Sequence, residues 1–308
     1  MGWLRKLIFG LSLEEASFAR RGFCAGDAGA RQRLEQIGRT FLHGYHAALE
    51  EDEPEALAYR LNAVELEWRG FAFEGAAMGL SLLDHLTPWR RSRLRAFLNG
   101  PGSTHAYMVH VGVGWTLARL RRQVEPTLAR LDPVLRWLAV DGYGFHEGYF
   151  HWSRCVEGQA IPDRLTDYAR RVFDQGLGRS LWFVNGADVK RIPATIAAFP
   201  PSRQADLWSG IGLACAYAGG VEGRALQALR AAAGSHRPPL AQGAAFAAKA
   251  RQRAGNPAAH TQLACEIICG VPADVAARIT DAALENLPTD GPEPTYEVWR
   301  RRIQNQFL

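Results

Sequence analysis

Apolar side chains return every three or four residues along most of the chain. This spacing, which places them on one face of an α-helix, runs through the segments 30–50, 127–150, 162–184 and 277–287. The strict alternation of apolar and polar residues that is typical of strands is nearly absent. Clusters of proline and glycine, such as "GSHRPPL" at 234–240, separate the helical segments. The pattern therefore predicts an all-α protein, either a helical-repeat (α-solenoid-like) structure or a multi-helix bundle.

Short segments of the chain also resemble one another at regular distances. Two patterns alternate, the first as "RGFAF" (69–73), "DGYGF" (141–145) and "SGIGL" (209–213), the second as "GVGWTL" (112–117) and "GLGRSL" (176–181). Copies of one pattern stand roughly 64–72 residues apart, which is typical of stacked helical units that bury a face against their neighbours. We therefore expect a single all-α domain over 1–308, with possible sub-units at 20–100, 101–160, 161–235 and 236–308.

The composition narrows the class of protein. Of 308 residues, 47% are hydrophobic, which is a globular value. The formal charge of +5 comes almost entirely from arginine, and the basic residues do not gather as a nucleic-acid surface requires, so we expect no nucleic-acid partner. Five cysteines without a CxxC pair predict reduced thiols in a cytoplasmic protein. No apolar run is long enough for a transmembrane segment, although the "GWLRKLIFGL" start could touch a membrane surface.

The segment 141–152, "DGYGFHEGYFHW", carries the densest set of candidate functional groups. On a helix Gly144 and Gly148 share one face, and small residues four apart allow a second helix to approach closely. Packing therefore explains the glycines. The same face is flanked by Asp141, Glu147 and His151, whereas His146 is expected to point away and to be structural.

The repeats provide an internal comparison for these polar groups. The positions that match Glu147 and His151 are small or uncharged in the sister copies, namely Gly75 and Gly79 in one and Cys215 and Gly219 in the other. A glutamate and a histidine four apart on a helix can hydrogen-bond one another, and burying them unpaired is costly. The pair is therefore either a buried polar staple or a functional pair. If it is functional, the candidate catalytic residues are Glu147, His151, Asp141 and Tyr149.

Several familiar chemistries lack their sequence motifs. The histidines of "HEGYFH" stand five apart rather than four, no E-x-x-H is present, and phosphate-binding loops and a G-x-S-x-G elbow are missing. We therefore expect no metal and no cofactor. Glu147 could orient His151 for proton transfer, and Tyr149 and Tyr143 could stabilise an oxyanion. The predicted pocket residues are Phe145, Phe150, Trp152, Trp115, His110, Gly144 and Gly148, which suit a hydrophobic unsaturated substrate.

Four motifs carry a resemblance to a known family: "RGFAFEGAAMGLSLLD", "HAYMVHVGVGW", "DGYGFHEGYFHW" and "DLWSGIGLACAYAGGV". Over about residues 20–285 the chain resembles an uncharacterised bacterial family, a domain of unknown function, encoded beside enediyne polyketide synthases. The resemblance implies an accessory or tailoring role in polyketide or polyene (enediyne-type) biosynthesis, a form of secondary metabolism. Such an enzyme would be a cofactor-independent isomerase, cyclase or lyase. The alternative is a non-catalytic helical scaffold or chaperone that binds the synthase or its acyl carrier protein.

Overall fold

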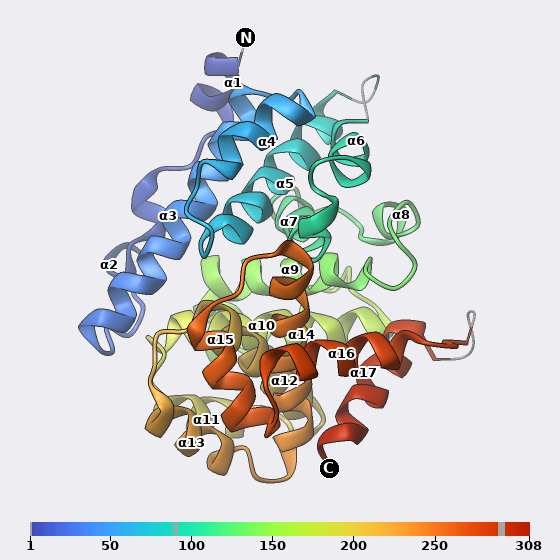
Figure 1. Ribbon diagram of the computed structural model, residues 1–308. Coiled ribbons are helices and arrows are strands. Elements are labelled where there is room, and N and C mark those ends of the chain that lie inside the picture. Colours follow the sequence, from blue (N-terminus) through green and yellow to red (C-terminus); the bar gives the residue numbers. More distant parts are fainter. Residues whose placement is uncertain (1, 88, 90–91, 289–292) are drawn as a thin grey trace.

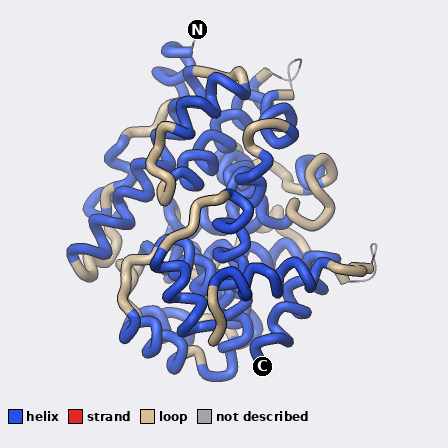
Figure 2. The backbone as a smooth tube through the Cα atoms, viewed as in Figure 1, coloured by secondary structure: helices blue, strands red, loops and turns tan. Residues whose placement is uncertain are grey.

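The described part of the chain folds into helices joined by loops, without strands (Figure 2), which confirms the all-α prediction. The structure, a computed structural model, describes residues 2–87, 89, 92–288 and 293–308. The α-helices are α1 (Gly2–Phe9), α2 (Phe18–Arg21), α3 (Ala28–Glu50), α4 (Pro54–Asn62), α5 (Arg69–Leu86), α6 (Arg93–Asn99), α7 (Ala106–Arg119), α8 (Glu125–Leu128), α9 (Trp137–Phe150), α10 (Asp167–Val184), α11 (Arg191–Ala197), α12 (Pro201–Ala218), α13 (Gly223–Ala232), α14 (Arg237–Ala254), α15 (Ala259–Ala264), α16 (Ala273–Leu284) and α17 (Thr295–Gln304).

The sequence specifies several helix ends directly. Asp27 caps α3, because its carboxylate accepts a hydrogen bond from the Ala30 amide at 3.0 Å. Pro201 begins α12, at a position where its missing N–H is not needed. Gly255 ends α14 in the left-handed conformation, at φ 62°, which a glycine adopts without steric cost. No helix in the described part of the chain is both long and apolar enough to cross a bilayer.

Eight longer helices form a stack in chain order, each packed against the one before it. The order is α3, α5, α7, α9, α10, α12, α14 and α16. Figure 1 shows α3, α5 and α7 in one half of the molecule and α10, α12 and α14 in the other, with α9 between them. Each helix of such a stack contacts mainly its two neighbours, as in other helical-repeat proteins.

The helices of this stack touch backbone to backbone at glycines. On α9, a Cβ atom added to Gly142 would lie 2.0 Å from the Val111 carbonyl oxygen of α7. One added to Gly144 would lie 2.1 Å from the Phe173 carbonyl oxygen of α10. Residues two apart point about 200° away from each other around a helix. A Gly-x-Gly sequence therefore lets one helix approach the preceding helix on one side and the following helix on the other.

The same arrangement recurs in four successive helices of the stack. Their glycine pairs are Gly112 and Gly114, Gly142 and Gly144, Gly176 and Gly178, and Gly210 and Gly212. The first glycines of neighbouring pairs are thus 30 to 34 residues apart. The 64–72-residue unit predicted from the sequence spans two of these helices. The structure refines it to a repeat of one stacked helix and its connecting segment.

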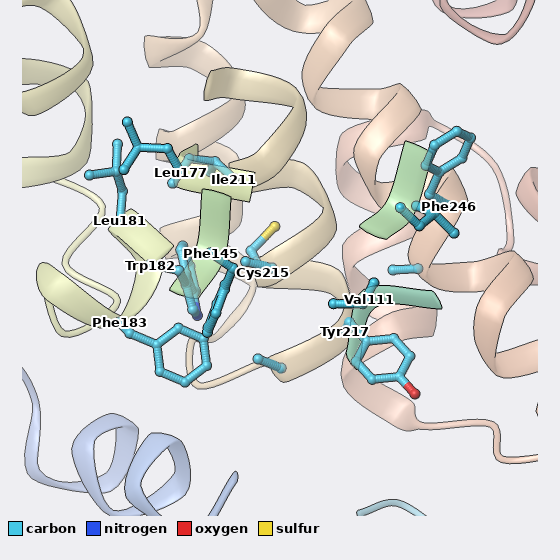
Figure 3. Close-up of a cluster of buried hydrophobic side chains, with 14 of the residues drawn as sticks. Val111, Phe145, Leu177, Leu181, Trp182, Phe183, Ile211, Cys215, Tyr217 and Phe246 are labelled. Carbon is cyan, nitrogen blue, oxygen red and sulfur yellow. The ribbon is translucent and has the colours of Figure 1, made fainter. Parts of the chain in front are cut away.

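The stack curves until its beginning meets a later member. Arg33 on α3 donates from Nε to the Ala218 carbonyl oxygen at the end of α12, at 2.5 Å. The inner side of the curve is filled largely with aromatic and aliphatic side chains, among which Phe145 and Phe183 pack edge to face at 5.3 Å (Figure 3). The concave side of the stack is therefore the place where an internal cavity can form.

We predict that the substitution Gly210→Ala destabilises the protein strongly. The new methyl group would lie 2.0 Å from the Gln175 carbonyl oxygen, so α10 and α12 must separate, at a cost of about 3 kcal/mol or more. Urea denaturation measures this as a lower midpoint. The control is Gly223→Ala at the start of α13, where the nearest atom is 3.4 Å away and stability should stay within about 1 kcal/mol of the wild type. Equal effects of the two substitutions would contradict the packing role of Gly210.

Candidate functional site

A narrow apolar cavity lies on the concave side of the stack. It encloses about 650 Å³ of empty space, counting the part of its mouth that is open to solvent. Its lining is mostly apolar, as is typical of ligand pockets in proteins. Its wall consists of Leu11, Glu15, Ala16, Ile37, Gly38, Phe41, Leu42, Phe71, Glu74, Trp115, Phe145, Tyr149, Phe150, Arg179, Phe183, Leu213, Ala214, Tyr217 and Ala218. The cavity is therefore built jointly by α3, α5, α7, α9, α10 and α12, with the segment 11–16 as a further wall.

The helical repeat itself builds much of this wall. In each Gly-x-Gly helix, the residue directly after the second glycine points into the cavity: Trp115, Phe145, Arg179 and Leu213. One helical turn later the wall continues with Tyr149, Phe183 and Tyr217. Arg179 is thus the one charged residue in a row that is otherwise apolar.

Arg179 is held between two buried carboxylates. It donates from Nη1 to Asp141 in a short hydrogen bond, and its Nη2 lies 3.9 Å from Oε1 of Glu74. Glu74 also accepts a hydrogen bond from Trp115 Nε1 at 3.0 Å. The guanidinium lies 4.9 Å from the centre of the Phe145 ring, in a cation–π contact. Glu74 and Arg179 therefore form a charged centre in an apolar cavity.

Asp141 lies behind this centre and anchors it. Its second oxygen accepts a hydrogen bond from Gln175 Nε2 at 2.8 Å, and the same nitrogen lies 3.0 Å from the Tyr296 hydroxyl oxygen of α17. Asp141 is fully buried. Because it contacts Arg179 more closely than Glu74 does, most of the guanidinium charge is neutralised on the side away from Glu74.

The protonation of Glu74 follows from this environment. Burial raises the pKa of Glu74 from 4.5 to about 7, because the opposing effects of Arg179 and of the Trp115 hydrogen bond are smaller, and the charge of Asp141 raises it further. A carboxyl group with a pKa near neutrality can give and take a proton under ordinary conditions. Glu74 is therefore the group in the cavity best suited to acid–base chemistry.

Glu147 belongs to a second cluster outside the cavity wall. Its Oε1 accepts a hydrogen bond from His146 Nδ1 at 3.3 Å, and its Oε2 accepts one from Arg154. Burial raises the pKa of Glu147, but the contact with His146 and the nearby cationic groups outweigh this, so the net shift is downward. Burial lowers the pKa of His146, so this imidazole is neutral near pH 7.

The expected side-chain pairing of Glu147 with His151 is thus replaced by pairing with His146 and Arg154. The reason is that α9 ends at Phe150, and His151 has left the helical conformation with φ −130° and ψ 38°. The four-residue helical geometry no longer holds there, and the His151 side chain is exposed to solvent. His146, expected to face away from Glu147, contacts both that carboxylate and the Trp115 and Phe150 rings.

The other residues predicted for the site separate into two groups. Trp115, Phe145, Phe150 and Tyr149 lie in the cavity wall, and the Tyr149 hydroxyl donates to the Glu15 carbonyl oxygen at 3.1 Å. The second group lies outside the wall. Gly144 and Gly148 pack against α10, His110 contacts the Ala106 carbonyl oxygen at 2.7 Å, and Trp152 donates to the Arg21 carbonyl oxygen at 2.9 Å. Tyr143 is buried, which raises its pKa to about 12. The catalytic roles predicted for Glu147, His151, Asp141 and Tyr149 stay predictions.

Sequence reasoning missed all three charged residues of the cavity wall, Glu15, Glu74 and Arg179, of which the last two form its charged centre. A repeat of about 34 residues, once known, aligns Arg179 with Trp115, Phe145 and Leu213, where a charge stands out. It also aligns Glu74 with Asp141, because each directly precedes the glycine that touches the preceding helix, Gly75 or Gly142. The sequence therefore contained a signal for Glu74 and Arg179, but the predicted repeat unit of 64–72 residues concealed it.

Metal-ligating side chains do not gather anywhere in the described ranges: no three His, Cys, Asp or Glu residues there are placed to hold an ion. The five cysteines are free thiols, and Cys155, Cys215 and Cys265 are buried.

Comparison with known proteins places the chain in a family. Residues 1–307 match a family described as "Protein of unknown function (DUF1702)". The chain belongs to this family. No curated protein and no solved structure matches the chain. The helical stack and its cavity therefore give this DUF1702 protein its most direct structural clue to function.

We predict that Glu74 makes the stability of this DUF1702 protein depend on pH. Its pKa is higher in the folded than in the unfolded protein, so the folded state binds more protons between the two values, and stability falls as pH rises from about 5 to about 8. The expected loss from this one group is on the order of 3 kcal/mol. Urea denaturation of the wild type and of Glu74→Gln at both pH values measures it. The variant should lose less stability over this range, and identical profiles would contradict a raised pKa.

A second prediction concerns the effect of Asp141 on the pKa of Glu74. In Asp141→Asn the charge of Arg179 is no longer shared and a repelling carboxylate is gone, so the pKa of Glu74 should fall. Carboxyl carbon NMR of glutamate-labelled protein measures that pKa. The control is Asp174→Asn, which removes another buried carboxylate, paired with Arg203, without touching this centre. A fall in both variants, or in neither, would contradict the arrangement.

Proposed function

We propose that this protein binds an elongated, mostly apolar and unsaturated small molecule in the central cavity and moves a proton on it through Glu74. The single observation that carries the proposal is a buried carboxyl group, hydrogen-bonded by Trp115 and adjacent to Arg179, in the wall of an otherwise apolar cavity. Such a group is costly to bury and brings no packing advantage over an apolar side chain.

The cavity wall supports the class of ligand. The Trp115 ring lies 4.3 Å from the Phe41 ring and 5.2 Å from the Phe145 ring, centre to centre, so the wall presents a set of aromatic surfaces. Flat conjugated chains pack well against such aromatic surfaces. Apolar burial supplies the affinity, and the Glu74–Arg179 centre fixes the position of the ligand along the cavity.

Proton transfer by Glu74 needs no cofactor. As a neutral acid, Glu74 gives its proton to one atom of a conjugated chain, while Arg179 and Trp115 stabilise the carboxylate that forms. The carboxylate then takes a proton from another atom of the same chain, and Glu74 returns to its starting state. The net result is a shift of double bonds or a ring closure with no gain or loss of atoms.

The resemblance of four sequence motifs to a family encoded beside enediyne polyketide synthases supports a polyketide-derived polyene as the substrate. A tailoring step on such a chain agrees with the apolar, aromatic wall of the cavity. An acidic acyl carrier protein is then the proposed source of the substrate.

Two variants test the proposal. Binding of a fluorescent conjugated polyene fatty acid should be lost, by about tenfold or more, in Ala214→Phe, whose new ring would occupy the cavity. In Glu74→Gln the same probe should bind within a few-fold of the wild type, but formation of the pathway product should stop. Circular dichroism and thermal unfolding of each variant show that it is folded.

Three outcomes would overturn the proposal or part of it. Wild-type protein that takes up no polyene would exclude the ligand class. Product formation that survives Glu74→Gln but stops in Glu147→Gln would move the chemistry to the cluster around His146. Tight synthase or carrier-protein binding, with normal product formation in all three variants, would favour the scaffold instead.

A further inference from the structure

The first helix of the chain exposes its apolar face. Trp3, Leu7 and Ile8 of α1 are 70%, 72% and 61% exposed, and Leu4 is 45% exposed. On a helix these four residues cover one continuous side. Soluble proteins rarely present several large apolar side chains together on one short helix, and such patches mark contact with a partner or a membrane.

The polar face of α1 is turned inward instead. Arg5 forms an ion pair with Asp52 at 3.1 Å, and Lys6 forms one with Glu50 at 2.8 Å. The helix backbone packs closely as well, since a Cβ atom on Gly2 would lie 2.0 Å from the Glu50 carbonyl oxygen. Helix α1 is therefore fixed to α3 through its charged side, which leaves the apolar side facing solvent.

The charges next to this face are compensated within the chain. Glu50 also pairs with Arg60 of α4 at 2.7 Å, so α1 and α4 meet at the same carboxylate. The residue before Arg60, Tyr59, is 82% exposed. Figure 1 shows α1 and α4 together at one end of the molecule. An exposed tryptophan beside apolar residues, as Trp3 is in α1, is typical of surfaces that lie at the boundary between lipid and water.

We propose that the apolar face of α1, formed by Trp3, Leu4, Leu7 and Ile8, docks on a lipid bilayer surface with zwitterionic headgroups. The occupant follows from the charges: Arg5 and Lys6 are paired with carboxylates of this chain, so an anionic headgroup gains no additional attraction from them. Apolar burial alone then drives docking. Leu11, two residues after the end of α1, lies in the cavity wall, so the segment that follows the docked helix reaches the cavity. The proposal does not depend on the chemistry proposed for Glu74.

The test uses vesicles of pure phosphatidylcholine and the full-length protein. Wild type should float with the vesicles, equally well at low and high salt, and Trp3 fluorescence should shift to the blue. The double variant Leu7→Glu/Ile8→Glu should bind about 100-fold more weakly or worse, since both side chains are exposed and their apolar contact with lipid would be lost. The control Leu308→Glu, at the opposite end of the molecule in Figure 1, removes an equally apolar side chain that is 92% exposed and should bind as wild type.

Other results would overturn the proposal. Failure of the wild type to float would exclude a lipid partner. A blue shift that persists in Trp3→Phe would place the contact elsewhere, for example at Trp89, which is 82% exposed. A concentration-dependent dimer in sedimentation experiments, abolished by Leu7→Glu/Ile8→Glu and accompanied by no vesicle binding, would assign this face to a second copy of the chain.

Discussion

The contact of helix backbones at glycines is the constraint on which the rest of this structure depends. Each glycine inside a helix costs about 1 kcal/mol relative to alanine. In the stack, the cost is offset because carbonyl oxygens of one helix approach the Cα atoms of the next, which brings many atoms into dispersion contact and allows weak Cα–H···O bonds. Two glycines per helix allow both neighbouring helices to approach closely. The large side chains are thereby left to the two remaining sides of each helix, one of which faces the cavity.

The charged centre of the cavity does not contribute to this close packing. Arg179 stands between Asp141 and Glu74, one cation for two carboxylates, all almost completely buried. Replacing such a group with apolar residues commonly leaves stability equal or higher. The closer contact with Asp141 and its support from Gln175 give the arginine a fixed place, and Glu74 is left as the group whose proton can move.

The helices, and the packing role of their glycines, could be predicted from the sequence because both are local: apolar spacing of 3.6 residues and small residues on one helix face. The predicted repeat unit was twice as long as the structural one, because alternate helices resemble one another in sequence more than neighbouring helices do. The predicted pairing of Glu147 with His151 assumed that the helix continues through His151. Helix α9 ends one residue earlier, at Phe150, so the two side chains do not share a helix face. Glu74 and Arg179 lie far apart in the sequence and meet only because the stack curves, which no local pattern records.

One consequence follows from the position after each second glycine. Trp115, Phe145, Arg179 and Leu213 project from places that the backbone contacts hold fixed, and all four line the cavity. Exchanging these four side chains changes the shape and polarity of the cavity without changing how the helices fit together. The stack thus acts as a frame with interchangeable inward positions, in which ligand preference can diverge between relatives while the frame stays the same.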